Sequence, residues 1–195
     1  EDGHSHLLSA TIPICVSYDP CFSYELAVII QNGLERMIKN QEDVFYYITI
    51  MNENYTHPEM PKNINEDIIK GIYKYSESKA SGPKVQLMGS GVILREVIEA
   101  ASILEKDFNI SSTIYSVTSF TEVRRNALDI QRWNMLNPDK TEKKSILDEI
   151  ILDLESPIIT ATDYMKSFAE QIATFLPSKF ISLGTDGFGR SDSRE

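Results

Sequence analysis

The chain has 195 residues, 42% of them hydrophobic, and its 29 acidic against 19 basic residues give a formal net charge of -10 at pH 7. This hydrophobic content is enough to bury a core, while the negative charge argues against a nucleic-acid-binding protein, because phosphate contacts need concentrated Lys and Arg. No apolar stretch approaches the roughly 20 residues of a membrane span, so we expect neither nucleic acid nor a membrane as a partner.

The first six residues, Glu1-Asp2-Gly3-His4-Ser5-His6, place carboxylates and two imidazoles close together. Histidine is the side chain whose ordinary pKa suits proton transfer near neutral pH, so His4 and His6 are candidate catalytic acid–base residues. Gly3 lets the backbone bend towards a ligand. The alternative interpretation is a polar terminus with solvated histidines.

Neither a secretion signal nor a metal-binding cysteine pattern is predicted. The start of the chain is acidic and polar, where a signal peptide would be positively charged. Cys15 and Cys21 match no zinc-binding spacing, so we expect two free thiols in a reducing cytoplasm. Because the sequence lacks an initial Met, we also expect the natural chain to begin earlier.

A β-α-β unit is predicted for the first fifty residues. Residues 11–18 and 44–50 have the composition of strands. Between them, Asp19-Pro20 is typical of a helix start, and the helix is expected to reach about Lys39. Apolar residues at three- and four-residue steps predict one buried stripe on this helix, formed by Ala27, Ile30, Leu34 and Ile38. The default arrangement is a parallel strand pair with a right-handed crossover.

The composition then becomes polar and rich in Asn, Ser and Pro, which predicts a linker over residues 56–84, with room for a short helix or strand over 66–75. Beyond it, strands are predicted over 85–88, 113–117, 157–161 and 180–183, and helices over 92–106, 121–135, 145–154 and 164–175. This alternation predicts an α/β domain with a mostly parallel sheet and helices on both faces.

Two glycine-rich segments follow predicted strands. Gly89-Ser90-Gly91 precedes a helix, where free backbone N–H groups can hold a phosphate, but it lacks the further residues of a nucleotide-binding motif. Residues 184–192 lie at the edge of the sheet where α/β proteins place ligands. A structural turn is the simpler interpretation of both segments.

Six segments together resemble one family, in the right order along nearly the whole chain. They are Glu1-Asp2-Gly3-His4-Ser5-His6, Tyr46 to Tyr55, Gly89-Ser90-Gly91 with Ile93-Leu94-Arg95, Ser116 to Glu122, Thr162-Asp163-Tyr164-Met165 and Leu183 to Glu195. The family is the homodimeric bacterial pyruvate dehydrogenase first component, one of the transketolase-like thiamine enzymes. The resemblance implies that residues 1–55 end a pyrimidine-binding domain, that 56–84 link it onward, and that 85–195 form a truncated transketolase C-terminal-like domain.

The resemblance also implies a function. The family decarboxylates pyruvate with thiamine diphosphate and Mg²⁺, and transfers the acetyl group to the lipoyl group of dihydrolipoyl acetyltransferase. The motifs that bind this cofactor and metal lie outside the chain, so no cofactor or metal ligands are expected here. His6 corresponds to a substrate-facing histidine of transketolases and Asp2 to the acid of the same motif, which implies substrate binding by Asp2. His4 has no transketolase counterpart.

Two other functions stay open at this point. One is that the chain serves mainly to stabilise a dimer, because the family's C-terminal domain carries little of the active site. The other is that it belongs to another enzyme of the superfamily, such as transketolase, although His4 and the ending Asp186-Gly187-Phe188-Gly189-Arg190-Ser191-Asp192 argue against that. In either case we expect the chain alone to be inactive.

Overall fold

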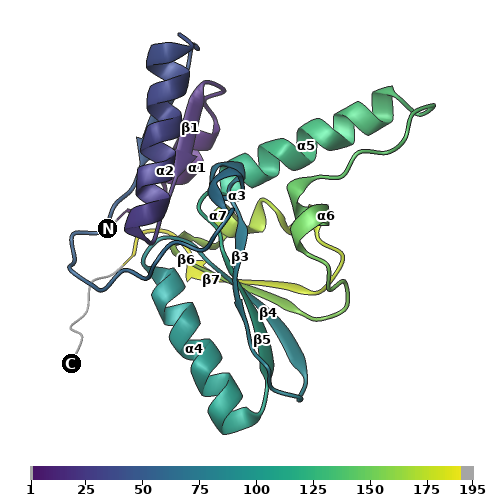
Figure 1. Ribbon diagram of the computed structural model, residues 1–195. Coiled ribbons are helices and arrows are strands. Elements are labelled where there is room, and N and C mark those ends of the chain that lie inside the picture. The colour runs from purple at the N-terminus through teal and green to yellow at the C-terminus, as the bar shows by residue number, and fades with distance from the viewer. Residues whose placement is uncertain (1, 190–195) are drawn as a thin grey trace.

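The computed structural model describes residues 2–189, which form two sheets with helices around them (Figure 1). The smaller sheet pairs β1 with β2, and the larger one has the strand order β3-β5-β4-β6-β7. The strands are β1 (Cys15–Tyr18), β2 (Phe45–Ile48), β3 (Tyr73–Glu77), β4 (Lys84–Gly89), β5 (Ser111–Ser116), β6 (Ile158–Met165) and β7 (Phe180–Thr185). The helices are α1 (Ser5–Ala10), α2 (Ser23–Leu34), α3 (Asn65–Lys70), α4 (Ile93–Phe108), α5 (Phe120–Leu136), α6 (Ile146–Ile150) and α7 (Lys166–Glu170).

The first unit contains the predicted β-α-β arrangement. β1 and β2 are parallel, and α2 connects them before continuing as a π-helical turn, Glu35–Lys39. A short helix that the sequence did not predict, α1, precedes β1. Cys15 and Cys21 are both buried, free thiols.

The larger sheet is mostly parallel, as expected. β4 pairs in parallel with β5 and β6, β6 pairs in parallel with β7, and β3 alone runs antiparallel, along β5. One face packs against α4, whose Leu94 and Val97 meet Leu87 of β4. The opposite face packs against α5, α6 and α7, which cover Met88 and Ile158. Helices therefore lie on both faces of the sheet, and Figure 1 shows α4 on the side away from α5 to α7.

The segment predicted as a linker contains more structure than expected. Within residues 56–84, α3 ends at Gly71, which has a left-handed φ of 103°, and the chain then enters β3. The prediction allowed a short helix or strand over residues 66–75, and the structure has one of each. β3 is an edge strand, and only its first residue, Tyr73, is fully buried. The chain therefore joins the larger sheet before residue 85.

The helix after β1 also differs from the prediction in two ways. It begins at Ser23, where Glu25 accepts the backbone N–H groups of Cys21 and Phe22 at 2.6 and 2.8 Å, so Asp19 does not cap it. Much of the expected buried stripe is exposed: Ile30 is 45%, Leu34 55% and Ile38 66% accessible. The prediction of a buried stripe is therefore wrong, because the buried residues of α2 are Glu25, Ile29 and Gly33.

The last two predicted helices are shorter than expected. α6 starts as predicted, with Ser145 and Asp148 forming a capping box, but ends at Ile150. The helix predicted over 164–175 is divided between α7 and a 3-10 turn, Ala173–Phe175, because β6 extends to Met165. Alternation of buried and exposed residues along β6 explains this extension, since it is the pattern of a strand.

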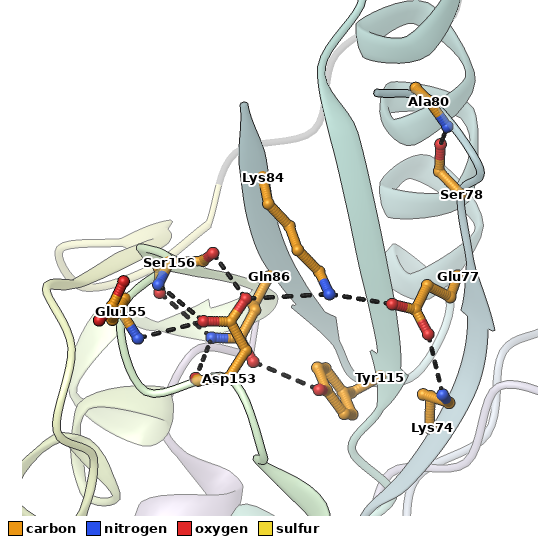
Figure 2. A network of polar contacts seen from close by, with 10 residues as sticks. All are labelled: Lys74, Glu77, Ser78, Ala80, Lys84, Gln86, Tyr115, Asp153, Glu155 and Ser156. Carbon is orange, nitrogen blue, oxygen red and sulfur yellow. Dashed lines mark hydrogen bonds and ion pairs between the residues drawn. The ribbon is translucent and has the colours of Figure 1, made fainter. Parts of the chain in front are cut away.

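A polar network fixes the start of β4 (Figure 2). Gln86 is fully buried and donates to the carbonyl oxygens of Asp153 and Ser156 at 3.0 and 3.1 Å, while Tyr115 donates to its side-chain oxygen at 3.2 Å. Lys84 adds a 2.9 Å ion pair with Glu77 of β3. These contacts hold one end of the sheet and leave its opposite, carboxyl end to face the smaller sheet.

Candidate functional site

Polar side chains gather where the carboxyl ends of both sheets meet. Asp19 follows β1 and Thr49 follows β2, while Ser90 follows β4 and Thr162 lies near the end of β6. The backbone joins the two sheets here, because Asp19 N–H donates to Thr118 O and Gly91 N–H donates to Asp19 O, each at 2.8 Å. The carboxyl edge of parallel strands is where α/β proteins place their ligands.

His6 lies at the centre of this region and is 1% exposed. It sits on the first turn of α1, and its ring contacts Tyr47, Tyr164 and Phe168, with ring centroids 4.7 to 5.3 Å away. Its Nε2 lies 2.8 Å from Thr49 Oγ1, whereas its Nδ1 is buried without a hydrogen-bond partner among the described residues. Burial lowers the pKa of His6 to about 4, against a smaller opposing effect of Asp2. His6 is therefore neutral at pH 7.

Asp19 is a functional candidate that sequence reasoning missed. Its Oδ1 accepts a 2.6 Å hydrogen bond from Thr49 Oγ1. Burial raises its pKa to about 6, although hydrogen bonds from Thr49 and Ser90 act in the opposite direction. The Asp-Pro pair had been interpreted as a helix start. The available signal was its place directly after a strand at the ligand-binding edge of a parallel sheet.

The Gly89-Ser90-Gly91 turn packs against this carboxylate. Gly91 has a left-handed φ of 52°, and a Cβ atom at this position would lie only 2.6 Å from Asp19 Oδ1. Ser90 is buried and its Oγ lies 3.3 Å from Thr162 Oγ1. The turn therefore closes over Asp19, as a tight structural turn would.

The N-terminal loop contacts the beginning of the glycine-rich segment after β7. Gly3 O accepts the N–H of Met165 at 3.1 Å, and a Cβ on Gly3 would collide with Gly187 O. The half-buried ring of His4 meets Phe188 edge-on, with centroids 4.7 Å apart. The structure thus places residues 3 and 4 beside residues 187 and 188, while residues 190–192 of the predicted glycine-rich loop lie outside the described range.

Asp2 fixes the conformation of this loop. Its Oδ1 accepts the backbone N–H groups of His4 and Ser5, both at 2.9 Å. The pKa of Asp2 is lowered, because hydrogen bonds from Ser5 and His4 outweigh the raising effect of burial. The three predicted site residues are thus adjacent but differ in environment: Asp2 is exposed, His4 half-buried and His6 buried.

This arrangement suits the movement of protons. A buried neutral imidazole, a partly exposed imidazole and hydroxyl groups can exchange protons with the oxygen or nitrogen atoms of a ligand. No cluster of three or more His, Cys, Asp or Glu side chains suited to a metal ion occurs within residues 2–189. Nor does any described helix have the length and apolar character needed to cross a membrane.

Comparison with known proteins gives two family matches. A model described as pyruvate dehydrogenase E1 component middle domain matches residues 1–58, and one described as transketolase-like TK C-terminal domain matches residues 71–195. Pyruvate dehydrogenase E1 components from Pseudomonas aeruginosa and Escherichia coli are each 55% identical over the whole chain, and that from Cupriavidus necator is 51% identical. The chain spans 22% of the length of each of these relatives.

Solved structures agree with the fold. A transketolase from Campylobacter jejuni superposes with a TM-score of 0.66 at 16% identity, covering 98% of this chain and 24% of the transketolase. A transketolase mutant from Pichia stipitis superposes with a TM-score of 0.62 at 14% identity, covering 97% of this chain and 23% of that one. At such identities the likeness concerns the fold alone.

Proposed function

Since this chain belongs to the transketolase-like C-terminal domain family and begins with a pyruvate dehydrogenase E1 middle-domain segment, we propose that it is part of an enzyme that decarboxylates pyruvate. The enzyme would use thiamine diphosphate and pass the acetyl group to the lipoyl group of dihydrolipoyl acetyltransferase. The observation that carries the proposal is identity of 48 to 57% along the full chain to proteins named pyruvate dehydrogenase E1 component.

The described residues fit the reacting end of this cofactor rather than its diphosphate. When bound, thiamine diphosphate supplies a carbanion that adds to the pyruvate ketone and an electron sink for the loss of carbon dioxide. His6 presents an unpartnered, buried Nδ1, the kind of atom expected to meet a ligand group from outside the described chain. In this proposal His4, which is half-buried and precedes α1, exchanges a proton with a substrate oxygen.

Asp2 has a supporting part in this proposal. One of its carboxylate oxygens already holds the backbone at His4 and Ser5, so it orders the loop that carries His4 and leads into α1, which carries His6. Its substrate-binding role then falls to the second oxygen. A carboxylate with a lowered pKa stays charged at neutral pH and suits a hydrogen-bond donor on the substrate.

We also propose the location, oligomeric state, metal ion and domain boundaries of the enzyme. The enzyme would be a cytoplasmic homodimer that binds Mg²⁺ through residues outside this chain. Residues 1–55 would complete a pyrimidine-binding domain and 85–195 would begin the C-terminal domain. The apolar side chains that α2 exposes, Ile30 and Leu34, support a contact with further polypeptide.

The test is to replace each histidine in the full-length protein. We expect His4→Ala and His6→Ala to lower pyruvate-dependent acetyl transfer by about 10²- to 10⁴-fold, the usual contribution of one acid–base group. His57→Ala is the matched control, because His57 is exposed and is the only other histidine of the chain. The measurements are carbon dioxide release and lipoyl acetylation at saturating pyruvate.

A second candidate function is support of a dimer without a part in the chemistry. The exposed apolar stripe on α2 favours it, because such a stripe is typical of an interface. Wild-type rates in both histidine variants, combined with loss of the dimer on replacing Ile30 and Leu34 by Ser, would favour this function and contradict catalysis by the loop.

A further inference from the structure

We propose that Thr49 and Asp19 are positioning residues for His6, which hold its ring as the tautomer with hydrogen on Nε2 and leave Nδ1 as the atom that meets the substrate or cofactor. This inference rests on the proposed function for the role of Nδ1. The assignment of the tautomer rests on the hydrogen-bond distances around Thr49 and on an ionised Asp19 carboxylate. Neither Thr49 nor Asp19 stood out in the sequence, because they lie 30 residues apart after two different strands.

The direction of the hydrogen bonds follows from counting hydrogens. Thr49 Oγ1 carries one hydrogen and has a short contact on each side, 2.6 Å to Asp19 Oδ1 and 2.8 Å to His6 Nε2. An ionised carboxylate only accepts, so the threonine hydroxyl donates to Asp19. Its remaining lone pairs can only accept, and therefore His6 Nε2 must donate. The other acceptor near the hydroxyl, Tyr18 O, lies at 3.4 Å and competes weakly.

The consequence for the second ring nitrogen follows directly. A neutral imidazole with hydrogen on Nε2 has a lone pair on Nδ1. This atom is buried and has no hydrogen-bond partner among residues 2–189, while aromatic rings of Tyr47, Tyr164 and Phe168 limit the rotation of the imidazole. The pair Thr49–Asp19 thus orients a free acceptor atom inside an otherwise apolar setting.

Such an arrangement serves a transient proton transfer. When Nδ1 takes a proton from a ligand O–H or N–H group, the ring becomes an imidazolium, and the charge is stabilised through the Thr49 hydroxyl by the Asp19 carboxylate. The proton returns by the same path, so no other reactant is needed. An aspartate that orients a catalytic histidine and stabilises its charged form is a known device, and here a hydroxyl group lies between them.

Two Thr49 variants of the full-length enzyme test the positioning role. Thr49→Val keeps the shape and removes the hydroxyl, and we expect the turnover number for acetyl transfer to fall by at least about tenfold with a smaller change in KM. Thr49→Ser retains the hydroxyl and should recover most of this loss. Thr174→Val, at an exposed threonine in the 3-10 turn, is the matched control. Equal losses in the valine and serine variants would overturn the positioning role.

Neutron diffraction from deuterated crystals of the wild-type enzyme tests the tautomer independently of activity. The expected result is deuterium on His6 Nε2 and on Thr49 Oγ1, the latter directed at Asp19. Deuterium on Nδ1 with none on Nε2 would overturn the proposal whatever the kinetics show. If His6→Ala retains full activity while the expected deuterium pattern is found, the proposed catalytic function fails and the structural assignment stands.

Discussion

Burial shifts the pKa values of His6 and Asp19 in opposite directions, and both shifts favour the neutral form. The pKa of His6 falls from 6.5 to about 4, and that of Asp19 rises from 3.8 to about 6. Between about pH 4 and 6 both groups are neutral in the folded protein, while in the unfolded chain both are charged over most of this range. Above about pH 6 the folded site holds an ionised aspartate and a neutral histidine, the state on which the proposed hydrogen-bond direction depends.

The linked pH dependence can be measured. As the pH falls from 6.5 towards 4, His6 becomes protonated in the unfolded chain but stays neutral in the folded protein. His6 therefore lowers the free energy of unfolding over this range, by on the order of 3 kcal/mol. His6→Phe should remove this decline. Asp19 raises the free energy of unfolding over the same pH range, because the folded protein protonates this residue first as the pH falls through 6. Denaturant titrations from pH 4 to 7.5 check this; parallel curves for wild type and His6→Phe would contradict it.

Only part of the candidate site could be predicted from the sequence. Asp2, His4 and His6 are neighbours in the chain, so the sequence alone was enough to propose them as candidates. The partners that distinguish His6 from His4 come from distant segments, Thr49 and Asp19 among them. The contact among His6, Thr49 and Asp19 cannot be read from sequence spacing, because it forms only when the ends of β1 and β2 meet α1 in the folded protein.

At the scale of the elements, the turn after β4 requires a glycine at position 91. Gly91 adopts a left-handed φ of 52°, and a side chain there would press on the Asp19 carboxylate. Gly91→Ala should therefore lower the free energy of unfolding by about 1–3 kcal/mol and also disturb the contact between Asp19 and Thr49. Thermal unfolding measures the effect.

Gly187→Ala provides the control, because a Cβ at Gly187 would meet nothing within 4 Å. We expect it to change stability by less than about 0.5 kcal/mol. Equal destabilisation by the two substitutions would contradict the argument from the turn.

The main helices and strands of the larger domain were predicted because their patterns are strong. β4 contains the apolar residues Val85, Leu87 and Met88, β5 contains residues typical of strands, Thr113 to Tyr115, and α4 has a clear apolar face. The incorrect predictions concern exposed elements. β3 is an exposed edge strand, and no described residue buries the apolar stripe of α2. Hydrophobic patterns show which residues need burial, whereas the partner that buries them is set by tertiary contacts.

At the scale of the whole molecule, Glu25 joins the two units. It lies on α2, is fully buried, and accepts hydrogen bonds from Tyr73 of β3 and Ser116 of β5 at 2.7 and 2.6 Å. Its other oxygen holds the start of α2. Every donor that points at this carboxylate would lose its acceptor if the side chain became apolar.

Glu25→Met should therefore destabilise the protein by on the order of 3 kcal/mol or more, since several buried donors would be left unpaired. We also expect the two units to unfold in separate steps once this link is lost. Glu35→Met is the control, because Glu35 forms only a solvent-exposed pair with Lys39. Denaturant unfolding followed by circular dichroism and by the fluorescence of Trp133 would show both effects; a single, unshifted transition would contradict them.

The seam between the sheets also limits how this protein can move. The end of β1 is tied to the larger sheet through Asp19 N–H to Thr118 O, Gly91 N–H to Asp19 O and Ser119 Oγ to Ser17 O, with lengths of 2.6 to 2.8 Å. A hinge opening between the sheets would have to break all three bonds together. An incoming molecule would therefore meet two sheets held in fixed relative positions, beside the exposed ring of Phe188, which is 78% accessible.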